Sequence, residues 1–219
     1  VNLDAPYTFD GVDDFFYVAD HNDFDLSATL TMSAWIKPTG GGDTWQLIMT
    51  KNGVDGDNDR AYALWYKNSG QIYMYLGDDS ASTNMNTSGG TIADGTWHHV
   101  AATFDNSSNT GKIYINGVLS ATSTSLTTSP YNTGKRFTIG AVSDNDGSSA
   151  AEFQGEIADA KLFSDVLTAA EVQEISQKIN YDISLGSIGN LVGWWKLMGA
   201  VTDSGGSGHN LTAVGSPVQ

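Results

Sequence analysis

The sequence predicts an all-β protein, built as a sandwich of two packed antiparallel sheets with one short helix in its second half. Short runs rich in β-branched and aromatic residues alternate with clusters of Gly, Asn, Asp and Ser, which is the spacing of strands and turns in a sandwich or barrel. No helical pattern lies between these runs, so a parallel sheet with crossover helices is not expected. At 219 residues, the chain is expected to form a single domain over residues 1–219.

The strand pattern is clearest where a turn signal follows it directly. Residues 112–115 read Lys-Ile-Tyr-Ile and turn at Asn116-Gly117, a strong two-residue hairpin signal. Asn68-Ser69-Gly70 similarly separates two alternating runs. Strands are expected at 7–9, 15–18, 30–37, 45–51, 61–66, 71–76, 98–104, 112–115, 137–140 and 155–163.

One helix is predicted after the last of these strands. Thr168 and Glu171 form a capping box, and Leu167 can pack on Val172 across the helix start. The apolar residues that follow recur on one face of a helix, which favours packing on the sandwich. That apolar stripe consists of Val172, Ile175 and Ile179.

Residues 181–219 are expected to form a C-terminal extension that adds a strand to the sandwich. A polar connector at 181–190 leads into Leu-Val-Gly-Trp-Trp-Lys-Leu at 191–197, which reads as a strand. Residues 203–212 are rich in Gly and Ser, a composition also found in linkers.

Composition excludes several classes of function. The formal net charge is −15, from 25 acidic and 10 basic residues, so nucleic acid is not an expected partner. No apolar run approaches the ~20 residues of a membrane helix, so no membrane span is expected. The chain has no cysteine, which excludes a disulfide framework, a thiolate metal site and a cysteine nucleophile.

Six short motifs follow one another along residues 7–179 in the order of a known family. F-D-G-V-D-D-F-F-Y-V at 9–18 resembles the family's opening F-D-G-x-D-D-Y-V, and G-T-W-H-H-V-A at 95–101 matches its G-x-W-H-H-V-A. The chain therefore resembles the laminin-G-like domains of the concanavalin A-like lectin/glucanase type. The resemblance implies a jelly-roll topology. The other four motifs lie at 32–38, 113–117, 155–163 and 167–172.

The segments 191–197 and 203–211 resemble a further family element that usually precedes the first strand. Here the element lies at the C-terminal side of the other motifs. Two interpretations remain open: it begins a second repeat, or it closes this domain from the other end.

The resemblance implies a structural Ca²⁺ between the first strand and the last long strand. By matching positions, the expected ligands are Asp10, Asp13, Asp14 and Asp159, and carboxylates suit the oxygen-rich shell of Ca²⁺. The family's usual I-D-D is Ile-Ala-Asp at 157–159, so one carboxylate is missing. The alternative is that Asp10 only makes a turn and Asp159 faces solvent.

Two acidic loops and one aromatic pair are candidate ligand contacts. The D-x-D-x-D loop at residues 55–59 resembles the start of an EF-hand. It lacks the later glutamate and the helices of an EF-hand, so it is not one. Neighbouring strand residues point to opposite faces, so one ring of the pair Trp65-Tyr66 must be directed away from the core. Exposed rings stack on sugars; Trp45, Tyr73, Tyr75 and Tyr131 could serve as well. The acidic candidates are Asp55, Asp57, Asp59, Asp144 and Asp146.

The four histidines are not expected to form a catalytic or metal site. His98 and His99 are adjacent in a strand, so they point to opposite faces and are expected to pack and to hydrogen-bond. His21 and His209 are isolated in the sequence and are assigned to the surface. No G-x-S-x-G or H-E-x-x-H motif occurs, and the E-x-D-x-E strand of related glucanases is absent, so no enzyme activity is predicted.

Two functions from different classes follow. The first is a non-catalytic, lectin-like recognition module for glycan or cell-surface polysaccharide, with a structural calcium. The second is a structural subunit or decoration protein of a virion, filament or cell-surface assembly, whose partners are identical or other surface subunits. Both place the chain outside the cell, on a cell surface or on a virion surface. A ligand groove with exposed aromatic rings favours the first, and a large intersubunit surface favours the second.

Overall fold

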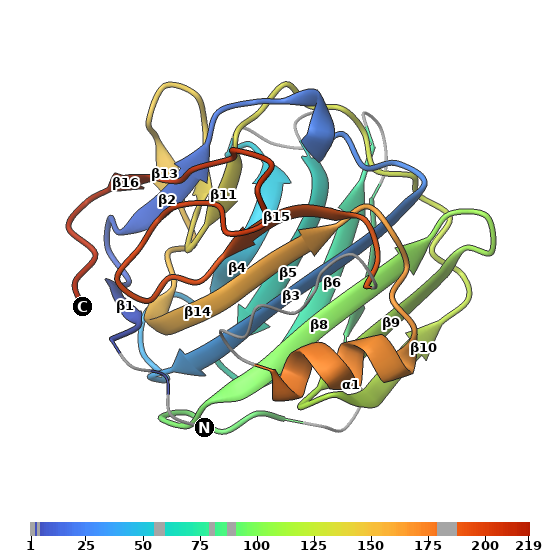
Figure 1. The fold of residues 1–219 in the computed structure, drawn as a ribbon, viewed down its shortest axis with the longest axis horizontal. Coiled ribbons are helices and arrows are strands. Elements are labelled where there is room, and N and C mark those ends of the chain that lie inside the picture. The colour runs from blue at the N-terminus through green and yellow to red at the C-terminus, as the bar shows by residue number, and fades with distance from the viewer. Residues whose placement is uncertain (1–2, 4, 55–59, 79–81, 87–90, 179–187) are drawn as a thin grey trace.

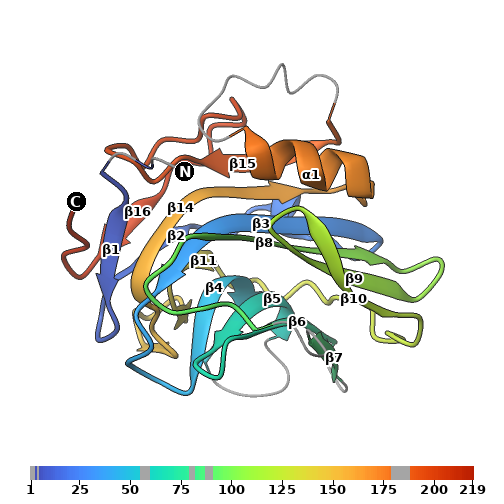
Figure 2. The same cartoon turned by 90° about the horizontal axis from the view of Figure 1, so that it is seen from below.

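Two seven-stranded antiparallel sheets stack face to face and form a jelly-roll sandwich, as the sequence predicts (Figures 1 and 2). The computed structural model describes residues 3, 5–54, 60–78, 82–86, 91–178 and 188–219. No helix in this part of the chain combines the length and the apolar character that a bilayer crossing requires.

The first sheet has the strand order β1-β14-β3-β8-β9-β10, and β15 also pairs with β14. Its longest strands, β3 and β14, pair from Pro38 opposite Gly155 to Thr31 opposite Phe163, with a bulge between Ala158 and Lys161. Its strands are β1 (Tyr7–Asp10), β3 (Thr29–Pro38), β8 (His98–Asp105), β9 (Thr110–Ile115), β10 (Val118–Ser123), β14 (Gln154–Phe163) and β15 (Leu191–Trp195).

The second sheet has the strand order β16-β2-β11-β4-β5-β6-β7, and a two-stranded ribbon of β12 and β13 accompanies it. The predicted hairpin across residues 68–70 is present as the pairing of β5 with β6. Its strands are β2 (Phe15–Val18), β4 (Trp45–Asn52), β5 (Arg60–Lys67), β6 (Gln71–Gly77), β7 (Ser82–Asn86), β11 (Phe137–Ile139) and β16 (Thr212–Val214), and the ribbon is β12 (Val142–Ser143) with β13 (Ser149–Ala150).

All ten predicted strands are present, and their ends differ from the predicted ends by at most two residues. The main core lies between the sheets, because alternate residues of each strand point inward. On β5, for example, Tyr62, Leu64 and Tyr66 are fully buried in this core. Strands β7, β10, β12, β13 and β16 were not predicted.

The helix α1 (Ala169–Gln177) packs on the outer side of the first sheet (Figure 2). The predicted capping box is confirmed: the Thr168 hydroxyl accepts from the Glu171 N–H, and the Glu171 carboxylate accepts from the Thr168 N–H at 2.7 Å. Two residues of the predicted stripe are buried in a cluster with side chains of β8, β9 and β14, and Ile179 lies outside the described residues. The buried stripe residues are Val172 and Ile175.

The C-terminal part of the chain adds a strand to each sheet. β15 pairs with β14, and β16 pairs with β2 (Figure 1). Trp195 is fully buried in the main core and stacks on Phe137 with ring centroids 5.2 Å apart. The C-terminal extension therefore supplies buried side chains to the core as well as strands that pair with both sheets.

Candidate functional site

The second sheet holds a pocket of about 760 Å³ on its outer face, over β4 to β7. Four aromatic side chains from three neighbouring strands line it, together with polar and small apolar side chains. A cavity of this size, with rings and a few polar groups, is the usual form of a small-molecule site. We call it the aromatic pocket; its lining includes Trp45, Trp65, Tyr73, Tyr75, Arg60, Asn84 and Val142.

Strand alternation places the rings of this pocket outside the core. On β5, Leu64 and Tyr66 belong to the main core, so Trp65 between them points outward. On β6, Tyr73 and Tyr75 alternate in the same way with buried apolar residues. Trp65 lies directly opposite Tyr73 in the β5–β6 register, so the rings stand side by side across two strands.

Trp45 completes the group from the start of β4. Its ring centroid lies 4.6 Å from that of Tyr73 at 71°, and 6.4 Å from that of Trp65 at 86°. These edge contacts fix the ring, the residue remains 40% exposed, and the Lys67 ammonium lies 4.9 Å from its centroid. The pocket thus offers fixed, solvent-facing rings, on which the apolar face of a ligand can stack.

Polar side chains stand beside these rings. The Arg60 guanidinium carbon lies 5.7 Å from the Tyr75 ring centroid, and Asn84 of β7 lies directly opposite Tyr75. Arg60 and Asn84 both line the pocket, and both can donate hydrogen bonds to ligand oxygens. The arrangement therefore combines stacking with directional hydrogen bonding in one cavity.

The structure separates the two predicted aromatic contacts. Trp65 lines the aromatic pocket, whereas Tyr66 is fully buried and points into the core, so the prediction of Tyr66 as a ligand contact is wrong. The Tyr66 hydroxyl donates to Asp94 Oδ1 at 2.5 Å. Burial raises the pKa of Tyr66, and the neighbouring Asp94 carboxylate raises it further.

The predicted acidic loops contribute nothing to the described lining of this pocket. Asp144 is 3% exposed and pairs with the Lys135 ammonium at 2.9 Å, which corrects its prediction as a ligand contact. Asp146 is exposed, but its Oδ1 accepts from the Ser148 N–H and hydroxyl. These hydrogen bonds lower the pKa of Asp146. The other three predicted residues lie outside the described part of the chain: Asp55, Asp57 and Asp59.

Three of the four predicted calcium ligands lie together at the end of β1. One carboxylate oxygen from each of Asp10, Asp13 and Asp14 lies within 4.8 Å of the others. They line a pocket of about 410 Å³ that Ser216 also borders. Asp14 Oδ1 accepts from the Ser216 N–H at 2.6 Å, and Asp10 Oδ1 accepts from the Val12 N–H at 2.8 Å. Burial, together with the charges of Asp10 and Asp13, raises the pKa of Asp14 against the hydrogen bonds that it accepts.

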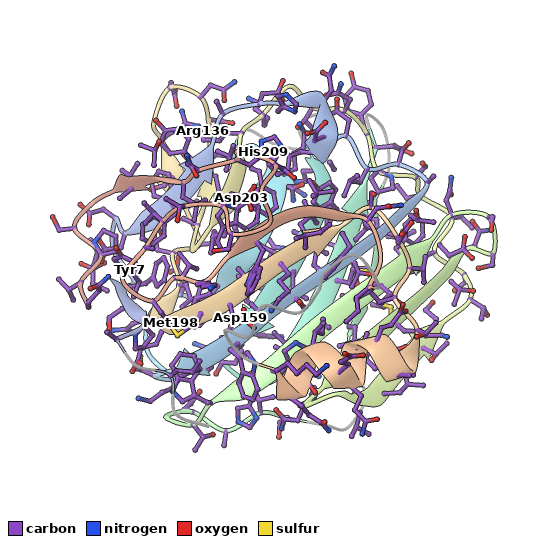
Figure 3. The ribbon with its side chains drawn as sticks, viewed as in Figure 1. Tyr7, Arg136, Asp159, Met198, Asp203 and His209 are labelled. Carbon is purple, nitrogen blue, oxygen red and sulfur yellow. The ribbon has the colours of Figure 1, made fainter. Side chains whose placement is uncertain are left out.

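Asp159 is not part of this cluster, and it does not face solvent either. It is 1% exposed in the β14 bulge, over the middle of the first sheet (Figure 3). Its Oδ2 pairs with the Lys161 ammonium at 2.5 Å, and its Oδ1 accepts from the Trp194 indole N–H at 2.7 Å. Burial lowers the pKa of Lys161, while the charge and hydrogen bond of Asp159 oppose that shift. Asp159 therefore neutralises a buried lysine and lies apart from the other three predicted calcium ligands, which corrects its prediction as one of them.

The adjacent histidines point in different directions, as predicted. His99 is buried against the Trp35 ring at 5.7 Å, and neither of its ring nitrogens has a hydrogen-bond partner among the described residues. Burial and the positive charge of Lys161 lower the pKa of His99 to about 3, so it is neutral at pH 7. The Nε2 of His98 instead lies 2.8 Å from the Thr96 hydroxyl.

Two sets of polar residues were not predicted. Arg60 and Asn84 reach the aromatic pocket only through the β5–β6–β7 pairing, and nothing in the sequence near them indicates this position. The second set, which comes together from the two ends of the chain, consists of His21, Asp23 and His209.

Comparison with known proteins agrees with the fold. A family model described as the concanavalin A-like lectin/glucanases superfamily matches residues 10–173. The rat protein named sushi, von Willebrand factor type A, EGF and pentraxin domain-containing protein 1 is 25% identical over 153 residues, which cover 68% of this chain. The match spans only 4% of that relative's length.

Solved structures of low identity share the same architecture. A candidate carbohydrate-binding protein from Bacteroides ovatus superposes with a TM-score of 0.72 at 18% identity, over 100% of this chain and 62% of its own. The heptameric SAP-like pentraxin of Limulus polyphemus gives 0.57 at 18% identity, over 82% and 85% of the two chains. The CBM40 of the Ruminococcus gnavus IT-sialidase, solved with α2,3-sialyllactose, gives 0.60 at 19% identity, over 77% and 96%.

Proposed function

The chain belongs to the concanavalin A-like lectin/glucanase superfamily, and from this premise we propose that it is a non-catalytic recognition module that binds glycan in the aromatic pocket. The observation that carries the proposal is the set of fixed, outward-facing rings of Trp45, Trp65, Tyr73 and Tyr75 in one cavity of about 760 Å³. A sugar ring has apolar C–H faces and a rim of hydroxyls. Stacking rings beside Arg60 and Asn84 match both parts.

Two further observations support this proposal. The structural neighbours include a carbohydrate-binding candidate and a sialidase CBM40 solved with sialyllactose, and both share this fold. The sequence carries no E-x-D-x-E strand or other catalytic motif of the fold's enzymes. We therefore propose binding without hydrolysis, in an extracellular or cell-surface setting.

Replacing the most exposed ring of the pocket is expected to weaken glycan binding. Because a central aromatic contact contributes about 2 kcal/mol, Trp45→Ala should raise the dissociation constant of a glycan identified on an array by roughly 30-fold. Trp45 is 40% exposed, so its loss should change the melting temperature little. Isothermal titration calorimetry on folded variants measures the effect.

The matched control is Tyr131→Ala. Tyr131 is 43% exposed but does not line the aromatic pocket, so its removal should leave affinity unchanged. Equal affinities of the wild type and Trp45→Ala would contradict the proposed site. Failure of every arrayed glycan to bind, together with self-association in sedimentation velocity, would favour the alternative of a structural subunit.

We also propose that Asp10, Asp13 and Asp14 hold a structural Ca²⁺. Their all-oxygen donor set suits this cation, and backbone carbonyls and waters would complete the six to eight oxygens that it requires. A cation would also offset the burial and the neighbouring charges of Asp10 and Asp13, which together raise the pKa of Asp14. Bound there, it would fasten the end of β1 to the C-terminal residues around Ser216.

Calcium should therefore raise the melting temperature of the chelator-treated protein. At a hundred times the dissociation constant, a native-state ligand adds about 2.7 kcal/mol, which is a rise of roughly 5–10 °C for a chain of this size. Asp13→Asn should reduce this rise, whereas Asp43→Asn, at an exposed aspartate outside the cluster, should retain it. An unchanged melting temperature on adding Ca²⁺ would show that the three carboxylates are solvated charge.

A further inference from the structure

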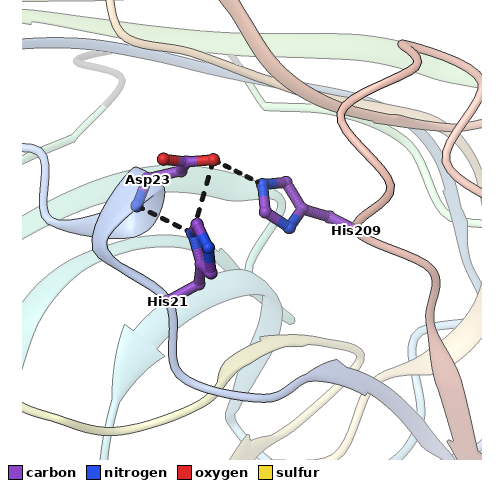
Figure 4. Close-up of side chains that lie close together, drawn as sticks. All are labelled: His21, Asp23 and His209. Atoms are coloured by element: carbon purple, nitrogen blue, oxygen red, sulfur yellow. Dashed lines mark hydrogen bonds and ion pairs between the residues drawn. The ribbon is translucent and has the colours of Figure 1, made fainter.

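Two histidines that are isolated in the sequence meet on either side of one carboxylate. His21 precedes the short helix η1 (Asn22–Phe24), which contains Asp23, and His209 lies in the C-terminal segment before β16. The Asp23 Oδ2 atom lies 2.8 Å from His209 Nε2 and 3.3 Å from His21 Nδ1 (Figure 4). The expected surface position is confirmed for His21, whose side chain is 54% exposed, and is wrong for His209, which is only 7% exposed.

The fold holds His209 in place from several directions. Its backbone N–H donates to Asp203 Oδ2 at 3.2 Å, and its carbonyl accepts from the Trp195 indole N–H at 2.7 Å. Its ring packs against Phe24, with centroids 4.8 Å apart. Figure 3 shows Asp203 and His209 close together on the C-terminal segment. These contacts hold the His209 imidazole in the orientation in which its Nε2 atom points toward Asp23.

His21 and Asp23 are held to each other by the start of η1. His21 Nδ1 accepts a hydrogen bond from the Asp23 N–H at 3.2 Å, so Nδ1 carries a lone pair. The Asp23 Oδ2 oxygen lies 3.3 Å from the same nitrogen. His21 Nδ1 and Asp23 Oδ2 are therefore close enough for one cation to contact both atoms.

The donor set identifies the class of cation. Two imidazole nitrogens and one carboxylate oxygen, all within 4.8 Å of one another, are the ligands that Zn²⁺ and similar divalent transition metals select, whereas Ca²⁺ takes oxygens alone. With metal–ligand bonds of about 2.0–2.2 Å, neighbouring ligands of a tetrahedral site lie roughly 3.3–3.6 Å apart. The observed separations of 2.8 and 3.3 Å need only small movements to reach this spacing.

We propose that His21 Nδ1, Asp23 Oδ2 and His209 Nε2 form a binding site for Zn²⁺ or a similar divalent transition metal. The side chains of His21 and Asp23 are 54% and 51% exposed, so water can occupy a fourth position. The metal would replace the hydrogen bond between Asp23 Oδ2 and His209 Nε2 at 2.8 Å and the one that His21 Nδ1 accepts at 3.2 Å. It would link the segment before β3 to the C-terminal segment, across 186 residues of sequence between Asp23 and His209. Metal binding would therefore strengthen the closure of the sandwich.

The test is thermal unfolding of the full chain, stripped of metal and then given Zn²⁺ or Co²⁺. Each ion should raise the melting temperature by about 5 °C or more at a hundred times its dissociation constant. Co²⁺ should also give the intense visible absorption bands of a four-coordinate nitrogen and oxygen site. His21→Ala and Asp23→Asn should abolish both effects, and both replace half-exposed side chains, so the variants are expected to fold.

Two controls separate this site from the rest of the molecule. His98→Ala removes a histidine outside the cluster and should retain the full Zn²⁺ response. Asp13→Asn, which should reduce the calcium response, should leave the Zn²⁺ response unchanged. The absence of both a Zn²⁺-dependent shift and cobalt bands would overturn the proposal, and so would an equal shift in His21→Ala. In either case His21, Asp23 and His209 form only a hydrogen-bonded cluster.

Discussion

Asp159→Asn is expected to destabilise the fold by about 3–5 kcal/mol, because it leaves the buried Lys161 ammonium without its counter-charge. Lys161 is fully buried, and its ammonium lies 2.5 Å from Asp159 Oδ2. Asparagine tolerates the positive φ of 52° at position 159 and keeps an oxygen for the Trp194 indole N–H. The loss therefore reports the missing charge and not backbone strain. Urea unfolding of the wild type and the variant measures it.

The double variant Asp159→Asn/Lys161→Met supplies the control. Replacing a buried ion pair with apolar groups of similar volume is often neutral, so the double variant should recover most of the stability that the single variant loses. If Asp159→Asn lowers the free energy of unfolding by less than ~1 kcal/mol, this account is contradicted. A buried group that loses its charged partner destabilises the fold by more than that. So small a loss would mean that Lys161 finds water or is neutral in the folded protein.

Trp195→Ala should lower the free energy of unfolding by a similar amount, about 3–5 kcal/mol, which corresponds to a fall of roughly 6–20 °C in melting temperature. The ring is fully buried between the sheets and stacks on Phe137 and Phe24, with centroids 5.2 and 6.5 Å away. Its indole N–H donates to the His209 carbonyl, so its loss also leaves a buried acceptor unpaired. Calorimetry or circular dichroism melting measures the change.

Two comparisons test the reason for this loss. Trp195→Phe keeps part of the stacking area and should cost less than Trp195→Ala. Trp45→Ala removes the same side chain from a position that is 40% exposed and should cost far less. Equal melting temperatures for Trp195→Ala and Trp45→Ala would show that the C-terminal segment does not contribute to the core.

The sequence was sufficient for the strands that carry a strong local pattern. In β9 and β5, alternation and turn residues specify both the strand and its end, because one face must be buried. The capping box at Thr168 likewise depends on residues three positions apart, which the sequence displays directly. These elements needed no knowledge of distant partners.

Strands without a periodic pattern of their own were missed. β16 consists of Thr212–Val214 and is defined by its pairing with β2, nearly the whole length of the chain away. β10 is an edge strand whose residues are mostly small and polar, and its burial pattern shows no alternation. β16 therefore leaves no local signal, whereas β10 pairs with its neighbour β9 across the predicted Asn116-Gly117 turn and lacks only the periodic pattern of a strand.

The aromatic pocket could be predicted only in part, because its lining also depends on tertiary structure. The adjacency of Trp65 and Tyr66 showed that one ring must face away from the core, but both rings suit either face. In the folded chain Tyr66 takes the core side, where its ring is fully buried and its hydroxyl donates to Asp94. The meeting of His21 and His209 was not predictable at all, because the C-terminal segment brings them together only in the folded chain.

The most direct test of glycan binding in the aromatic pocket is a titration of the protein with a glycan that binds it. Nuclear magnetic resonance then follows the indole N–H signals of the six tryptophans. Glycan in the aromatic pocket should shift the signals of Trp45 and Trp65 and leave those of the buried Trp194 and Trp195 unchanged. A second cavity, of about 630 Å³, is lined by Trp35 and Trp97. Shifts confined to those two signals, or the absence of any shift, would contradict the assignment of the aromatic pocket as the recognition site.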